Sequence, residues 1–167
     1  MDPQQVHGWL TKSEGERLAE LAAGKTVLEI GTFSGRSTIY MARTASRVHT
    51  VDVQVGHQGP LSSPTLLDLL KNLVAYGVNE KVFVHVGRSC DMPLPGHYFD
   101  MAFIDGDHTP EGVAFDCNIC LKAVKPGGVI AMHDIDYAGV LEASENTLLA
   151  CGWKLIETVD RLGVFQA

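Results

Sequence analysis

Short apolar runs alternate with stretches of helical spacing along most of the chain. Runs rich in β-branched and aromatic residues predict buried strands at 26–30, 48–53, 82–86, 99–105 and 129–134. Apolar residues that recur every three or four positions predict helices at 10–23, 38–45, 65–77, 111–124 and about 138–150. The helix at 10–23 has a capping box, from Thr11 to Glu14, and Gly24 is placed to end it.

This alternation predicts an α/β fold in which right-handed crossovers connect parallel strands. A tight turn is predicted at 126–128, and two more strands at 153–159 and 163–166. Because the last two strands are so close in sequence, they must form an antiparallel hairpin. We therefore predict a Rossmann-like, doubly wound, mostly parallel seven-stranded sheet with an antiparallel C-terminal hairpin. Residues 1–167 are expected to form one domain, with 1–9 as a flexible or capping segment.

Composition and charge favour a globular domain with a small-molecule partner. The 167 residues are 46% hydrophobic and 20% charged, which permits a sizeable core and excludes wholesale disorder. The net charge of −7 argues against nucleic acid as a partner, because phosphate contacts require basic residues. No apolar run approaches the roughly 20 residues that span a bilayer, and the polar start is unlike a secretory signal, so we expect no membrane association. Four scattered cysteines favour a reducing, cytoplasmic location.

Three of the predicted strands carry an acid at or near their ends: Glu29, Asp52 and Asp105. In open parallel sheets the ligand lies beyond the carboxyl ends of the strands, and an acid at the end of the second strand holds ribose hydroxyls. A glycine turn at 31–35 follows the first strand. A dinucleotide would require G-x-G-x-x-G, but Phe33 stands at the middle position and Glu29 would repel a pyrophosphate. The turn instead favours a ligand that carries an ammonium and a sulfonium group.

The segment E-I-G-T-F-S-G-R-S, together with Asp52, resembles the first two motifs of class I S-adenosylmethionine-dependent methyltransferases. The segments F-I-D-G-D-H and K-P-G-G-V-I-A-M-H-D and the terminal hairpin extend the resemblance over nearly all of residues 10–166. Within this class the chain is similar to the small O-methyltransferases of the macrocin-type and cephalosporin-hydroxylase group. It resembles the catechol O-methyltransferases more distantly.

The resemblance implies S-adenosyl-L-methionine as cofactor, S-adenosyl-L-homocysteine as product, and a role for each motif residue. Gly31 and Phe33 would line the methionine moiety, and Ser37 would bind its carboxylate. Glu29 would orient the amino end, and Asp52 would hold the ribose. The turn after the third strand would contact adenine. The cofactor-binding residues implied in this way are Glu29, Gly31, Phe33, Gly35, Ser37, Asp52, Arg88, Ser89 and Asp105.

A hydroxyl acceptor must lose its proton to a general base or with the help of a metal. Acids and histidines gather at the ends of two strands that we expect to be neighbours: Asp105, Asp107, His108, His133 and Asp134. The resemblance implies Asp105 and Asp134 as metal ligands and His108 as the base. His133 stands where the family usually has an acid. Aspartate ligands suit Mg²⁺, and the histidine shifts the expectation from Mg²⁺ toward Mn²⁺ or another transition metal. In the alternative, Asp105 bonds backbone or the cofactor amine, 133–134 is a structural pair, and His108 caps a helix.

The predicted function is therefore methyl transfer from S-adenosylmethionine to an oxygen of a small molecule, with a divalent metal as candidate assistant. A non-catalytic cofactor-binding module or partner subunit is the alternative, and a nucleotide-dependent oxidoreductase is disfavoured by the turn. Only the N-terminal segment and the loop at 55–64 remain to cover the site. The acceptor is therefore expected to be large and partly exposed, or the pocket to be completed in a homodimer. Cys117 and Cys120 are expected to be core residues, not zinc ligands.

Overall fold

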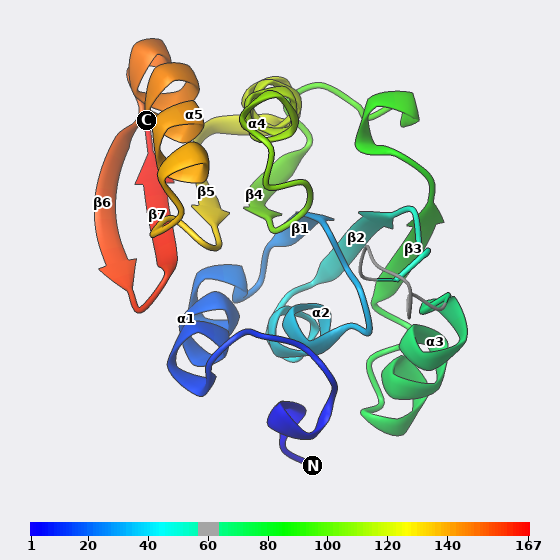
Figure 1. The fold of residues 1–167 in the computed structure, drawn as a ribbon. Coiled ribbons are helices and arrows are strands. Elements are labelled where there is room, and N and C mark those ends of the chain that lie inside the picture. Colours follow the sequence, from blue (N-terminus) through cyan, green and yellow to red (C-terminus); the bar gives the residue numbers. More distant parts are fainter. Residues whose placement is uncertain (57–63) are drawn as a thin grey trace.

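Seven strands form one sheet in the order β3-β2-β1-β4-β5-β7-β6 in a computed structural model that describes residues 1–56 and 64–167. Neighbours from β3 to β5 are parallel, whereas β7 is antiparallel to both β5 and β6 (Figure 1). The strands are β1 (Thr26–Ile30), β2 (Arg47–Asp52), β3 (Val82–Val86), β4 (Phe99–Ile104), β5 (Val124–Met132), β6 (Lys154–Val159) and β7 (Leu162–Gln166). The predicted sheet and its C-terminal hairpin are confirmed.

Helices cover both faces of the sheet (Figure 1). One face packs against α1 (Lys12–Ala22), α2 (Arg36–Ala42) and α3 (Leu66–Ala75). The other packs against α4 (Pro110–Ala123) and α5 (Ala138–Leu148). Three short 3₁₀ turns complete the described elements: η1 (Pro3–Gln5), η2 (Ser89–Asp91) and η3 (Leu149–Cys151). Among the described residues, no helix is long and apolar enough to cross a membrane.

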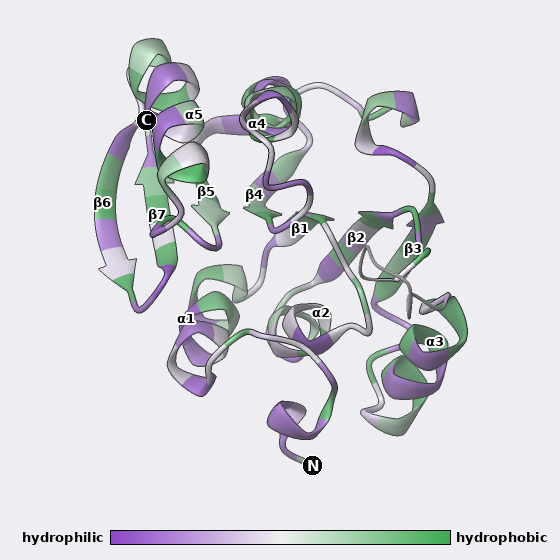
Figure 2. Ribbon diagram, viewed as in Figure 1, coloured by the Kyte–Doolittle hydropathy of each residue, from purple (hydrophilic) through white to green (hydrophobic). Residues whose placement is uncertain are grey.

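Each face of the sheet has its own hydrophobic core because side chains alternate along the strands. Val27 of β1 lies in the core under α1 to α3, and its neighbour Leu28 lies in the core under α4 and α5. The ribbon coloured by hydropathy shows long apolar stretches on β5 and β7, and helices of mixed character around them (Figure 2). Cys117 and Cys120 are free cysteines buried in the second core, as predicted.

The largest boundary difference from the sequence prediction lies at the start of β5, which the sequence predicts at residue 129. The helix predicted at 111–124 ends at Ala123, and β5 begins at the next residue. The turn predicted at 126–128 therefore lies inside β5, where the pairing with β4 shifts register. β5 pairs with β4 at Val124 and at residues 129–132, so the four residues between them, including Gly127 with φ of 76°, form an irregular bulge at the predicted turn.

Candidate functional site

The carboxyl ends of β1 and β4 approach so closely that only glycine fits at residue 31. Gly31 has φ of 90°, and a Cβ there would lie 2.0 Å from the carbonyl oxygen of Asp105. Gly35 also has φ of 90° and precedes α2. The turn at 31–35 thus brings bare backbone to the point where crossovers on opposite faces leave the sheet, which is where open α/β sheets bind ligands.

Asp52 at the end of β2 fixes this turn. Its Oδ2 accepts hydrogen bonds from the backbone N–H groups of Thr32 (2.7 Å) and Phe33 (2.8 Å). Its Oδ1 accepts from the N–H of Gln54 at 2.6 Å. The acid predicted to hold ribose therefore also orders the glycine turn beside it.

Glu29 and Ser37, two of the predicted cofactor residues, contact each other. The Ser37 and Thr38 hydroxyls donate to the two Glu29 carboxylate oxygens, at 2.5 and 2.6 Å. Burial of Glu29 raises its pKa to about 7, and the hydroxyl hydrogen bonds only partly oppose this. The carboxyl group is fully buried, and its hydrogen bonds with Ser37 and Thr38 hold the first turn of α2 in place.

The N-terminal segment packs over the glycine turn. The rings of His7 and Trp9 each lie 5.1 Å from the Phe33 ring, centroid to centroid. Arg36, the first residue of α2, donates hydrogen bonds to the backbone carbonyls of Gln4, Val6 and Leu10. The sequence contains no signal for the contact of His7 with Phe33.

The predicted adenine segment lies beside the end of β2. Gly87 donates its backbone N–H to the carbonyl of Asp52 at 3.0 Å. The Ser89 hydroxyl donates to Asp116 of α4 at 2.6 Å, and Arg88 is exposed.

Acids and histidines meet at the ends of β4 and β5, as predicted. His108 Nε2 lies 2.8 Å from Oδ2 of Asp134 and 3.7 Å from Oδ1 of Asp105. His133 Nδ1 lies 3.4 Å from Oδ1 of each of these aspartates. Asp105, His108 and Asp134 each offer one ligand atom, and these three atoms lie within 4.8 Å of one another. We call Asp105, His108, His133 and Asp134 the acid–histidine cluster.

Charges within the acid–histidine cluster shift its protonation equilibria. Burial lowers the pKa of His133, but the neighbouring carboxylates of Asp105, Asp134 and Glu14 outweigh it and raise the pKa to about 11. Burial alone would raise the pKa of Asp134, but the histidines beside it, His108 and His133, hold it well below its usual range. The bond to Asp134 raises the pKa of His108, which makes its neutral form a stronger base.

Glu14 is a member of this site that sequence reasoning missed. Its Oε2 accepts from the backbone N–H of Thr11 (2.7 Å) and lies 3.2 Å from His133 Nε2. Its Oε1 accepts from the backbone N–H of Arg161 (2.8 Å), whose guanidinium also donates to Asp134. The sequence identified Glu14 only as half of a capping box, which is confirmed.

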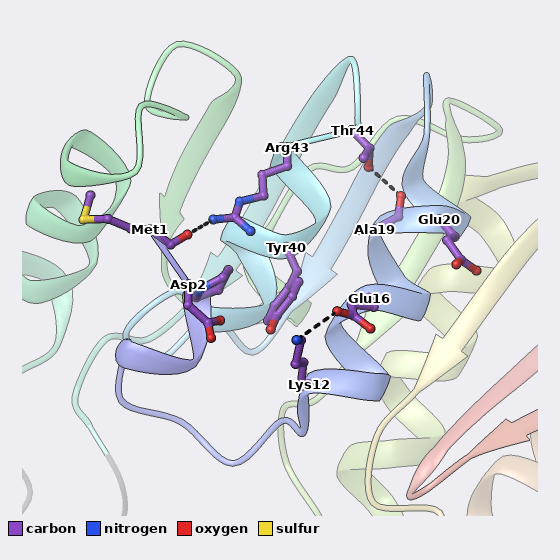
Figure 3. A pocket seen from close by; sticks show the side chains of 10 residues that line it. Met1, Asp2, Lys12, Glu16, Ala19, Glu20, Tyr40, Arg43 and Thr44 are labelled. Carbon is purple, nitrogen blue, oxygen red and sulfur yellow. Dashed lines mark hydrogen bonds and ion pairs between the residues drawn. The ribbon is translucent and has the colours of Figure 1, made fainter.

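A large surface hollow lies away from the acid–histidine cluster, and a small one lies at the cluster. A hollow of about 620 Å³ lies between α1, α2 and the first residues of the chain, and Figure 3 shows its Lys12–Glu16 ion pair. None of the predicted site residues line it. A hollow of about 10 Å³ lies at the cluster, lined in part by Asp105, His108 and His133. This is room for about one water molecule or one ion, so an acceptor must lie outside it.

Residues 28–135 match the methyltransferase domain family, and the chain belongs to that family. It is a class I methyltransferase domain, as the motifs predicted. The chain is 31% identical over 127 residues to a catechol O-methyltransferase of Niastella koreensis. It is 34% identical over 134 residues to a catechol O-methyltransferase of Mycobacterium tuberculosis. These matches cover 71% and 77% of the chain but only 52% and 56% of the relatives, so the chain spans about half of their length.

Solved structures give the same result for the fold. Cofactor-bound Rv0187 from MTB is 28% identical, with a TM-score of 0.75 and coverage of 99% of this chain and 84% of that one. An O-methyltransferase from Bacillus cereus in complex with SAH has a TM-score of 0.72 at 20% identity, and covers 98% of this chain and 86% of that one. The second likeness concerns the fold alone.

Proposed function

We propose that the chain transfers a methyl group from S-adenosylmethionine to a hydroxyl oxygen of a small molecule. The observation that carries this proposal is the contact of Gly31 with Asp105, because it joins the glycine turn directly to the acid–histidine cluster. A cofactor over the turn would then present its methyl group near a candidate base. The names of the two curated relatives support an oxygen acceptor and suggest a catechol as the first acceptor to test.

The residues around the turn fit the cofactor. The positive φ of Gly31 and Gly35 lets the backbone form a tight turn at the carboxyl end of β1, and Asp52 lies beside it. We propose that Gly31, Phe33, Gly35 and Ser37 contact the methionine part, and that Glu29 acts on its amino end through this turn. Asp52 would hold the ribose, Arg88 and Ser89 the adenine, and Asp105 the cofactor or a metal.

When bound, the cofactor supplies a methyl group on a sulfonium, and its transfer is an in-line displacement that depends on positioning. His108 is proposed as the base that takes the acceptor proton. Its side chain is 46% exposed, so an acceptor can reach it, and Asp134 orients the ring through Nε2 at 2.8 Å. A base of this kind contributes about 10²–10⁴-fold to a reaction rate.

The acid–histidine cluster also fits a divalent metal. The Nδ1 atom of His133 is buried without a hydrogen-bond partner and faces the Asp105 and Asp134 carboxylates. We therefore propose Asp105, His133 and Asp134 as its ligands, with His108 close enough to take part. When bound, a metal such as Mn²⁺ or Mg²⁺ would lower the pKa of the acceptor hydroxyl.

The test is methyl transfer from labelled S-adenosylmethionine to catechol and a panel of phenols, alcohols and sugars. We expect product with at least one hydroxyl acceptor, and a loss of about 10²-fold or more in His108→Gln with cofactor affinity unchanged. His97→Gln is a matched control, because His97 lies at the opposite end of β4. Cofactor binding without transfer to any acceptor would favour the non-catalytic module. The expected homodimer and cytoplasmic location remain predictions, the first of which light scattering tests.

A further inference from the structure

The Glu14 carboxylate determines which nitrogen of His133 carries a proton. An ionised carboxylate can only accept hydrogen bonds, and Glu14 Oε2 lies 3.2 Å from His133 Nε2. The backbone N–H groups of Thr11 and Arg161 donate to the two Glu14 oxygens, so both oxygens act as acceptors and the carboxylate is held in place at the start of α1. His133 therefore presents Nε2–H to Glu14, and its Nδ1 points the other way.

The opposite side of the His133 ring faces negative charge. Nδ1 is buried, has no hydrogen-bond partner, and lies 3.4 Å from a carboxylate oxygen of both Asp105 and Asp134. A cation is favoured between Nδ1 and these two carboxylate oxygens, either a proton on Nδ1 or a metal ion bound to it. A hollow of about 10 Å³, lined by Asp105, His108 and His133 but not by Asp134, opens beside the ring and has room for about one ion.

A carboxylate, a histidine and a metal in this order form an arrangement in which the carboxylate fixes the ring and raises the basicity of the ligating nitrogen. We propose that Glu14 is a positioning residue that presents His133 Nδ1 as a nitrogen ligand, so that the site selects a first-row transition ion such as Mn²⁺ over Mg²⁺. This inference rests on the proposed metal site. The preference follows because Mg²⁺ favours a shell of oxygen ligands and imidazole favours transition ions.

The experiment measures binding of Mn²⁺ and Mg²⁺ to the whole chain by calorimetry, and Mn²⁺ also by electron paramagnetic resonance. We expect Mn²⁺ to bind more tightly than Mg²⁺, and Glu14→Gln to weaken Mn²⁺ binding about 10–100-fold. His133→Asp should reverse the preference toward Mg²⁺, because it completes a set of oxygen ligands. Each of these readouts is independent of methyl transfer.

Glu14 also caps α1, so its structural role must be separated from its action on His133. Thr11→Ala removes the cap hydrogen bond to the Glu14 N–H but leaves the contact with His133. This variant should bind Mn²⁺ within about twofold of wild type. A double-mutant cycle adds the direct test: in a His133→Asn background, Glu14→Gln should no longer weaken Mn²⁺ binding.

Three results would overturn the inference: equal or tighter binding of Mg²⁺ by the wild type, an unchanged effect of Glu14→Gln in the His133→Asn background, or no saturable Mn²⁺ binding at all. The last result would remove the metal site as well. Binding of S-adenosylhomocysteine and methyl transfer by the same sample without added metal decide separately whether the rest of the proposed function stands.

Discussion

Glu29 should make the protein less stable as pH rises through the neutral range. Its pKa is about 7 in the folded chain, against an ordinary value of 4.5. Between these values the folded state binds a proton that the unfolded state does not, so stability falls with increasing pH. From pH 5 to pH 8 the loss amounts to about 2.5 kcal/mol, at 1.36 kcal/mol per pKa unit. Glu29→Gln removes this ionisation and keeps the shape of the side chain.

Urea unfolding at pH 5, 6, 7 and 8 measures the effect. The free energy of unfolding of Glu29→Gln minus that of wild type should rise by about 2.5 kcal/mol across this range, a relative shift of about 1 M in the urea midpoint. Glu16→Gln on α1, where the side chain is 60% exposed, is the matched control for the same substitution at an exposed position. If wild type and Glu29→Gln give parallel curves, the burial argument for Glu29 is wrong.

Three further predictions concern the glycine turn and the segment that covers it. Gly31→Ala should abolish binding of S-adenosylhomocysteine, measured by calorimetry, and destabilise the fold by about 1–3 kcal/mol, measured by urea unfolding. The reason is that its Cβ would overlap the Asp105 carbonyl. Unchanged binding would contradict this. Asp52→Asn should lower stability by about 1–3 kcal/mol in the same unfolding assay and weaken cofactor binding, because an amide cannot accept from all three N–H groups. Arg36→Ala should speed hydrogen exchange at residues 4–10 without a comparable change in β1, whereas uniform faster exchange would indicate global destabilisation.

The fold was predictable from the sequence because its signals are local. A buried parallel strand such as β1 is an apolar run of a few residues, and the short loop before β7 permits only a hairpin. The capping box from Thr11 to Glu14 depends on residues three positions apart. The early start of β5, before the turn predicted at 126–128, was not predictable, because it depends on the pairing of Val124 with Phe99 of β4, a tertiary interaction.

The site was predictable only where it lies at strand ends. Asp105 and Asp134 follow β4 and β5, which are neighbours, so their meeting follows from the topology. The contact of Glu14 with His133 joins residues 119 positions apart on different elements. No spacing rule relates a helix cap to a residue after the fifth strand, and only the packing of α1 beside the sheet brings them together.

The central claim is that this domain binds S-adenosylmethionine at the turn that follows β1. Calorimetric titration of the whole chain with S-adenosylhomocysteine tests this claim most directly, with NADH as the competing ligand and Gly31→Ala as the control protein. The account predicts saturable binding of one S-adenosylhomocysteine per chain, no binding of NADH, and no binding by Gly31→Ala. Binding of NADH in place of S-adenosylhomocysteine, or no binding of either ligand by the wild type, would contradict it.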